Sequence, residues 1–413
     1  MRARGHSLIT TFRVKKAGWE LRKRPPSREP FFHPATLFFL LAFTAVSLRP
    51  YLYSLYDMDM LGYMGNAVAM RGAGIREIHD TVYADVLRSV PEATRAHLLG
   101  QDGQGPASQI ASRKDRFANA YHFAEFLPCF AIRPIFNELI YVLHYKLGIG
   151  LVRATIVIPV LSYWLLGIIT FLWVSRYSGH VLAVPLSLVL MLCPPLLGLA
   201  RFNSPDALSC LFLMTGLFLI LEQQNVSWGL VVVLSSIYVR TDNVLLVLVV
   251  LAYCAFSSRM LTKVQGLLLA SVSVGSVLLI NHFAGDYGMR VLYYRSFIEV
   301  PMAPGELVVD FGWKNYLSAL RTAVSELANG YFFPFTFVGL LGLRSGSKRI
   351  ALMAIVFAFF ALHFLLFPSG QERFWGPYYL GMGITAIMSL PRKTCLDEET
   401  AGQEEDLLLE LAV

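Results

Sequence analysis

Long apolar runs recur along most of this 413-residue chain, and several reach the length of about 20 residues that a helix needs to cross a bilayer. Only 15% of the residues are charged, whereas soluble domains carry about 25%, so the chain lacks the polar surface to face water all round. The five cysteines are scattered without paired spacing, which is typical of small apolar residues and not of a disulfide set. These features exclude a soluble enzyme, a secreted disulfide scaffold and a disordered protein. We predict an all-α, polytopic membrane protein.

The net charge of +7 comes from the N-terminal segment, because residues 1–34 hold nine Lys or Arg and only two Glu. A basic segment beside a first span favours the cytoplasmic side of the membrane. We therefore predict a basic cytoplasmic tail over 1–34 and no nucleic-acid partner. The acidic segment 391–413 is predicted to be a second cytoplasmic tail.

The region 35–390 is predicted to form one transmembrane domain with about ten or eleven transmembrane helices. The first span is expected near 31–56, and later spans at 151–175, 181–199, 205–222, 264–283, 320–343, 348–367 and 372–390. The segment 131–147 is short and amphipathic, and it spans, re-enters or lies at the interface. The segment 227–257 is either one long helix or a hairpin bent at 240–243. The hairpin is preferred because it keeps Arg240 and Asp242 off the bilayer midplane, where a charge costs about 3 kcal/mol or more.

Residues 57–130 contain no run long enough to cross a bilayer, and we predict a large extracytoplasmic loop that is folded. Within this loop, 60–71 and 76–99 have helix-compatible spacing, and 100–106 is a turn or tip. Long ordered loops usually carry function, so the loop and its edges are the first place to look for a site.

Two carboxylates, Asp57 and Asp59, directly follow the first span. Partial desolvation at that position raises the basicity of a carboxylate and suits it to accept a proton from a hydroxyl. Aspartate is also favoured at helix N-caps, and Asp59 precedes a helix-like run. A general base and a helix cap are both open interpretations.

Five short segments, in chain order, resemble motifs of the GT-C superfamily, integral-membrane glycosyltransferases that use lipid-linked sugars. The Asp-rich entry with a Tyr four residues on, a hydrophobic first span and a long outer loop are similar to that superfamily. The segment at 133–139 looks like the stretch after the first loop in aminoarabinose and protein O-mannosyl transferases. The matching pieces are DMD at 57–59, RPIFNEL at 133–139, NSPDA at 203–207, RTDN at 240–243 and QERFWGPY at 371–378.

The resemblance implies an inverting transfer of a sugar from a polyprenyl-phosphate carrier to an acceptor hydroxyl on the outer face. It implies that Asp57 or Asp59 deprotonates the acceptor, and which of the two does so stays open. Arg373, with Arg240, would stabilise the departing lipid phosphate, since a guanidinium binds phosphate oxygens bidentately. The substrate-binding residues implied are Arg133, Asp206, Arg240, Asp242, Arg373 and Tyr378.

Simpler structural roles exist for several of these residues. Arg373 could snorkel to the interface beside Trp375, Arg240 with Asp242 could be an ion pair that fixes the hairpin, and Asp206 could cap a helix. His363 and the other membrane histidines show no ligand spacing, so no metal site is predicted.

The expected partners are a polyprenyl-phosphate-linked sugar, a glycan, lipid or protein acceptor, and membrane lipids. No cofactor is evident, a divalent metal requirement stays open, and the expected location is a bacterial inner membrane. Two rival functions are a lipid or sugar-lipid transporter, for which internal symmetry would be expected, and a non-catalytic membrane scaffold with the same fold.

Overall fold

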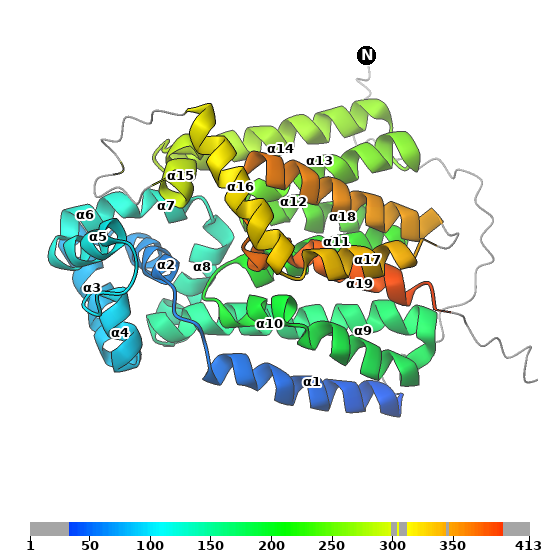
Figure 1. Cartoon of the computed structure of the whole chain (residues 1–413), viewed down its shortest axis with the longest axis horizontal. Coiled ribbons are helices and arrows are strands. Elements are labelled where there is room, and N and C mark those ends of the chain that lie inside the picture. Colours follow the sequence, from blue (N-terminus) through cyan, green and yellow to red (C-terminus); the bar gives the residue numbers. More distant parts are fainter. Residues whose placement is uncertain (1–32, 299–303, 305–311, 344–346, 391–413) are drawn as a thin grey trace, which may run out of the picture.

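The computed structural model describes residues 33–298, 304, 312–343 and 347–390 (Figure 1). Throughout these ranges the chain forms helices and turns, and the β-type pairing consists of an isolated parallel bridge between Leu55 and Phe202. The predicted all-α class is therefore confirmed for the described chain. The predicted tails 1–34 and 391–413 lie outside the described residues, apart from 33 and 34.

In the described residues, four helices are long and apolar enough to cross a bilayer, and this number rises to five if a pair bent by 117° counts as one span. This number fits a multi-pass membrane protein. The four helices are α1 Pro34–Leu52, α9 Leu151–Leu192, α14 Lys263–Phe283 and α18 Ser347–Leu366. The number is below the predicted ten or eleven because other predicted spans fold as apolar helices of 10–17 residues. Those shorter segments are Asp206–Leu221, Val226–Tyr238, Thr241–Ser257 and Phe332–Leu341.

Helix α9 runs for 42 residues but reverses direction at Gly179, whose φ of 74° is readily adopted only by glycine. The Tyr163 hydroxyl donates to the carbonyl of Met191, and the Thr170 hydroxyl lies 3.6 Å from the sulfur of Met191. The two arms of α9 therefore lie side by side, as Figure 1 also shows. The spans predicted at 151–175 and 181–199 fall on these two arms, with α10 Pro194–Arg201 closing the second.

Both segments that the sequence left open are broken helices. The segment 131–147 contains the end of α7 Pro128–Ala131, then α8 Pro134–Tyr141 and a π-helical turn, Val142–Lys146. The segment 227–257 divides at Arg240, whose φ of −148° and ψ of 124° are extended. A single continuous helix over 227–257 is excluded. Its pieces are α12 Val226–Ser235, η2 Ser236–Tyr238, η3 Thr241–Asn243, α13 Val244–Ala252 and η4 Tyr253–Ser257.

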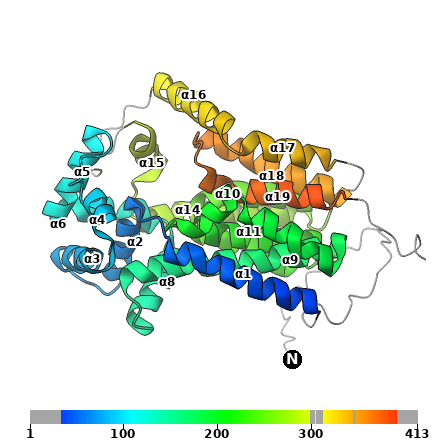
Figure 2. The ribbon, with the colours of Figure 1, turned by 60° about the horizontal axis from the view of Figure 1, so that its bottom comes forward.

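The segment predicted as a folded loop forms helices that gather at one end of the long apolar bundle, beside α15 Gly288–Phe297 (Figures 1 and 2). They share a core in which Tyr63, Phe123, Phe126 and Phe130 are buried. A Cβ atom at Gly62 would lie 2.2 Å from the Phe130 ring, so a glycine is required where the first of these helices crosses α7. The helices are α2 Met58–Ala69, α3 Ile75–Ser89, α4 Glu92–Leu98, α5 Ala107–Ala118 and α6 Ala120–Phe126.

Helix α11 Asp206–Leu221 lies in the middle of the apolar bundle and packs against α9, α12 and α19 Gly376–Ile387. It approaches α12 closely because Gly216 and Gly229 face each other, with no room for a Cβ atom on either. Small residues at helix crossings are the usual device for close packing in membranes. The remaining helices, α16 Trp313–Asn329 and α17 Phe332–Leu341, lead up to α18.

A strap of polar contacts joins the end of α1 to the start of α11. The amide of Leu55 donates to the carbonyl of Arg201 at 2.7 Å, and the Ser54 hydroxyl donates to the Asn203 side chain at 2.6 Å. The amide group of Asn203 also reaches the sulfur of Met60 in α2. The strap therefore fixes the chain just before Asp57 against the chain just before Asp206.

Candidate active site

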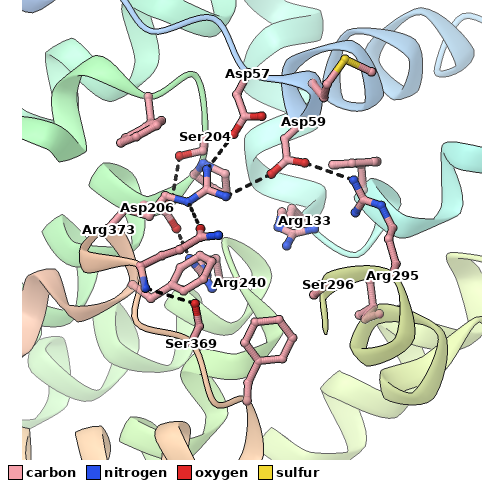
Figure 3. Close-up of a pocket in the computed structure, with 18 of the residues that line it drawn as sticks. Asp57, Asp59, Arg133, Ser204, Asp206, Arg240, Arg295, Ser296, Ser369 and Arg373 are labelled. Carbon is pink, nitrogen blue, oxygen red and sulfur yellow. Dashed lines mark hydrogen bonds and ion pairs between the residues drawn. The ribbon is translucent and has the colours of Figure 1, made fainter. Parts of the chain in front are cut away.

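A cavity of about 890 Å³ opens where four interruptions of the helical chain meet (Figure 3). They are the links between α1 and α2 and between α10 and α11, the break before α13, and the 3-10 turn η6 Glu372–Trp375 before α19. Helices α5 and α15 line the remaining sides. Irregular backbone at membrane depth is tolerated where it lines a polar cavity, so these breaks indicate where polar side chains collect.

Asp57 and Asp59 both line this cavity at the start of α2. Asp57 occupies the N-cap position of α2, and the backbone amides of Met58 and Asp59 favour its ionised form. Its carboxylate also accepts from Arg373 Nη1 at 3.0 Å, and Asp59 accepts from Arg373 Nη2 at 3.4 Å. The position at the helix start and the contact with a cation therefore occur together at Asp57.

Arg373 lies at the centre of the carboxylates, although 314 residues or more separate it from Asp57 and Asp59 along the chain. Its Nε donates to the side chain of Gln371 at 3.0 Å and lies 3.8 Å from Asp206 Oδ2. The planar guanidinium thus contacts three carboxylates that come from two different helix starts. The Arg373 side chain points into the protein and contacts carboxylates there. These contacts differ from those of an arginine that extends to the membrane interface.

A second arginine, Arg240, continues the network inward. It pairs with Asp206 through Nη1 and with Asp242 Oδ2 at 2.6 Å through Nη2. His363 on α18, only 2% exposed, adds an Nε2 contact of 2.7 Å to Asp242. We call Asp57, Asp206, Asp242, Arg240, Arg373 and His363 the acidic end of the cavity.

The opposite side of the cavity is lined by arginines. Arg295 of α15 lies 3.2 Å from Asp59 Oδ1, and Arg133 approaches the same carboxylate from the start of α8 (Figure 3). Arg113 and Arg116 of α5 complete the lining, one helical turn apart on one face. We call Arg113, Arg116, Arg133 and Arg295 the basic end of the cavity. Asp59 lies between the two ends.

The two aspartates have pKa values that move in opposite directions. Burial raises the pKa of Asp57 and the charge of Asp59 raises it further, against the opposing guanidinium of Arg373. Burial alone would also raise the pKa of Asp59, but the positive charges of Arg295, Arg373 and Arg133 outweigh it and lower that pKa. Asp57 is therefore the more basic carboxylate, and Asp59 is the one held in its ionised form.

Of the residues that the sequence singles out, Asp57, Asp59, Arg133, Asp206, Arg240, Asp242 and Arg373 all line this cavity. Tyr378 is not among the lining residues. It is buried in α19, where its hydroxyl contacts that of Thr336 at 2.6 Å and its ring stacks on Phe332.

Sequence reasoning missed Arg113, Arg116 and Arg295 and set His363 aside. The spacing of Arg113 and Arg116 in a helix was a usable signal for a shared face. No local pattern around Arg295 or His363 indicates that they reach Asp59 and Asp242. In the described part of the chain, no group of three or more His, Cys, Asp or Glu side chains is arranged to hold a metal ion.

The fold and the cavity define a class, an all-α protein of multi-pass type with a charged cavity at the end of its first long apolar helix. No protein-family model matches the chain, and comparisons with curated proteins and with solved structures find no significant similarity.

Proposed function

We propose that the protein is a membrane glycosyltransferase that transfers a sugar from a polyprenyl-phosphate donor to an acceptor hydroxyl on the extracytoplasmic face. The observation that carries the proposal is the pair Asp57 and Asp59, held on either side of Arg373 in a cavity at the end of the first long apolar helix. A base and a phosphate-binding cation are the two groups that such a transfer needs in one place.

Asp57 is the proposed general base. Its raised pKa makes its carboxylate a better proton acceptor, and its contact with Arg373 brings it next to the proposed phosphate position. In the transfer, Asp57 takes the proton of the acceptor hydroxyl while the acceptor oxygen bonds to the anomeric carbon. The bond from that carbon to the phosphate oxygen breaks, the phosphate leaves with the electron pair, and the configuration inverts.

Arg373 is the proposed phosphate ligand, with Arg240 supporting it. A guanidinium offers five N–H donors, and those that contact Gln371, Asp57 and Asp59 leave two for a ligand. Charge accumulates on the leaving phosphate during transfer, so a cation fixed in advance by carboxylates stabilises the transition state more than the ground state.

The cavity also has an apolar wall that suits a lipid-linked donor. Leu292 and Phe297 of α15 and Leu366 and Phe367 at the end of α18 line it. Leu366 is 46% exposed. A polyprenyl chain could leave the cavity along this wall while its phosphate remains at Arg373.

The proposed orientation puts helices α2–α6 outside a bacterial plasma membrane and both termini in the cytoplasm. The ten or eleven crossings predicted from sequence belong to the same proposal. A Gln104→Cys variant places a thiol on the exposed tip after α4. An impermeant maleimide should label it in intact cells, and labelling only after lysis would reverse the orientation.

The direct test of activity uses the purified protein in lipid nanodiscs with a set of radiolabelled polyprenyl-phosphate hexoses and pentoses. With membrane extract as the source of acceptor, the wild type should release polyprenyl phosphate and transfer label to a product. The proposal is rejected if the wild type releases no polyprenyl phosphate from any donor above the level of protein-free nanodiscs, whereas equal release by the wild type and Asp57→Asn would reject only Asp57 as the base.

A further inference from the structure

The two ends of the cavity differ in charge. At the acidic end, Arg240 and Arg373 face Asp57, Asp206 and Asp242 and share Asp59. At the basic end, among the ion pairs of the described residues, Asp59 is the carboxylate that the arginines contact, through Arg295. Within the described residues, Arg133 and Arg295 thus share the single carboxylate of Asp59, whereas Arg240 and Arg373 contact four carboxylates between them.

Two of these arginines lie against the same aromatic ring. The guanidinium carbon of Arg116 is 3.9 Å from the centre of the Phe126 ring, and that of Arg295 is 4.7 Å from it. Burial and the nearby charge of Arg295 together lower the pKa of Arg116 to about 10. Two guanidinium groups held beside one ring concentrate positive charge at this end of the cavity.

The other contacts of the basic end are mainly to neutral groups. Arg133 Nη1 donates to the carbonyl of Cys129 at 3.0 Å, and its guanidinium lies 5.6 Å from the ring of Tyr63. Arg113 contacts the ring and carbonyl of His97, which in turn holds Asp102 at 2.8 Å. The Nε atom of Arg295 is buried and has no hydrogen-bond partner in the described structure.

We infer that the basic end binds a second anionic group, a phosphate or carboxylate that belongs to the acceptor, while the donor phosphate binds at Arg373. The assignment of this group to the acceptor rests on the proposed function. Arg133 and Arg295 are its main ligands, because both border Asp59 from the side away from Arg373.

The location of the basic end favours the acceptor over the donor. Arg113, Arg116 and Arg133 come from the helical region that lies at one end of the bundle, whereas the apolar wall includes the end of α18. A water-soluble acceptor would approach from that region, and its hydroxyl would meet Asp57 once its anionic group was held by Arg133 and Arg295. A neutral sugar would gain hydrogen bonds from these arginines but no charge pairing, so the inferred acceptor class is acidic.

Binding of simple anions tests this inference without any transfer reaction. The full-length protein in nanodiscs is saturated with polyprenyl monophosphate, and its thermal stability is measured with inorganic phosphate, glucuronate or neutral glucose at constant ionic strength. Phosphate and glucuronate should each raise the melting temperature, and glucose should not. Arg133→Gln and Arg295→Gln should weaken the anion effect roughly tenfold to a hundredfold, since a charge-assisted contact is lost.

Arg76→Gln is the matched control, because Arg76 is an exposed arginine on α3 outside the cavity, and it should bind both anions like the wild type. If Arg295→Gln fails to fold after losing its partner Asp59, Arg133→Gln decides the matter alone. The inference is overturned if glucose stabilises as well as glucuronate, or if neither cavity variant changes the anion effect. It is also overturned if polyprenyl phosphate abolishes phosphate binding, because the basic end would then hold the donor phosphate.

This experiment separates the inference from the proposed function. Asp57→Asn should still bind glucuronate while it loses transfer. If anions bind at Arg133 and Asp57→Asn keeps full transfer, the anion site is supported and Asp57 is rejected as the base. Loss of transfer in Asp57→Asn without any anion binding would reject the anion site alone.

Discussion

The acidic end and the basic end of the cavity use the same residue types in different balance. At the acidic end, each arginine contacts at least two carboxylates. Arg373 contacts Asp57, Asp59 and Asp206. Arg240 contacts Asp206 and Asp242. At the basic end, Arg113 and Arg133 donate to carbonyl and amide oxygens and to the His97 ring. The first arrangement fixes geometry before any ligand arrives, and the second leaves binding capacity for one.

This difference predicts a division of labour. Changes at the acidic end should lower kcat, because they disturb groups that act in the transition state. Changes at the basic end should raise KM for the acceptor with less effect on kcat, because they remove binding that is uniform along the reaction. If changes at the two ends lowered kcat equally, the two ends would not have separate catalytic and binding roles.

The largest effect is expected for Asp57→Asn. Asparagine keeps the shape and the N-cap preference of aspartate but cannot take the acceptor proton, so transfer should fall roughly 10²–10⁴-fold. The rate is measured per mole of folded protein in nanodiscs. Asp80→Asn is the matched control, since that carboxylate is 78% exposed on α3 and lies outside the cavity. If the Asp57→Asn variant is folded and keeps full transfer, Asp57 is not the general base. Either Asp59 is the base, or neither aspartate is catalytic.

Arg373→Lys should come next, with a loss of roughly 30–1000-fold in kcat. Lysine keeps the charge but lacks the planar fork of five donors, so it cannot grip two phosphate oxygens while it also spans Asp57 and Asp59. Steady-state kinetics with a saturating donor measure the loss. Arg76→Lys serves as the matched control, and unchanged turnover in Arg373→Lys would mean that charge alone is needed there.

Asp59→Asn should change the pH profile more than the maximal rate. Asp57 must be ionised to act as a base, so activity rises with pH through its pKa, which lies above the ordinary value of about 4 for aspartate. Removal of the Asp59 charge relieves one cause of that rise, so the acid limb of kcat/KM should move to lower pH. A limb that stays in place, or moves to higher pH, would show that Asp57 does not control it.

Tyr378→Phe should have the smallest effect. The Tyr378 hydroxyl contacts Thr336 inside the bundle and does not line the cavity, so kcat and KM should both stay within about twofold of the wild type. Loss of this buried hydrogen bond should lower the free energy of unfolding by about 1 kcal/mol. A large rise in donor KM would return Tyr378 to the substrate-binding set that the sequence predicts.

The all-α class follows from the sequence because apolar length is a local property that composition and runs reveal. The bend at Arg240 was also predictable, since a charged residue within an apolar run is expensive unless the helix breaks there. Four helices of the described chain reach full spanning length, because hydropathy marks apolar runs but does not mark where a run divides. Between α16 and α17, the local signals are the turn dipeptide Asn329–Gly330 and the change from an amphipathic to an apolar helix.

The sequence predicted those residues of the candidate site that belong to a short local motif. Asp57, Arg240 and Arg373 stand in short patterns that could be recognised one at a time, and the fold brings them into one cavity. Arg295 and His363 have no such pattern. Their contribution depends on α15 and α18 docking against Asp59 and Asp242, and pairing over 236 and 121 residues of sequence is not readable from one chain.

The strap between the end of α1 and the start of α11 has a consequence for biosynthesis. Its partners Ser54 and Asn203 are 149 residues apart, Arg373 follows Asn203 by a further 170 residues, and Asp57 and Arg373 are 316 residues apart. At a synthesis rate of about 5–20 residues per second, Arg373 emerges roughly 15–60 s after Asp57. During that interval the nascent chain contains Asp57 and Asp59 but not Arg373, whose guanidinium later contacts both carboxylates. A chain that stopped before Arg373 would therefore lack the guanidinium that contacts both aspartates, and the charged cavity is completed only when η6 has been made.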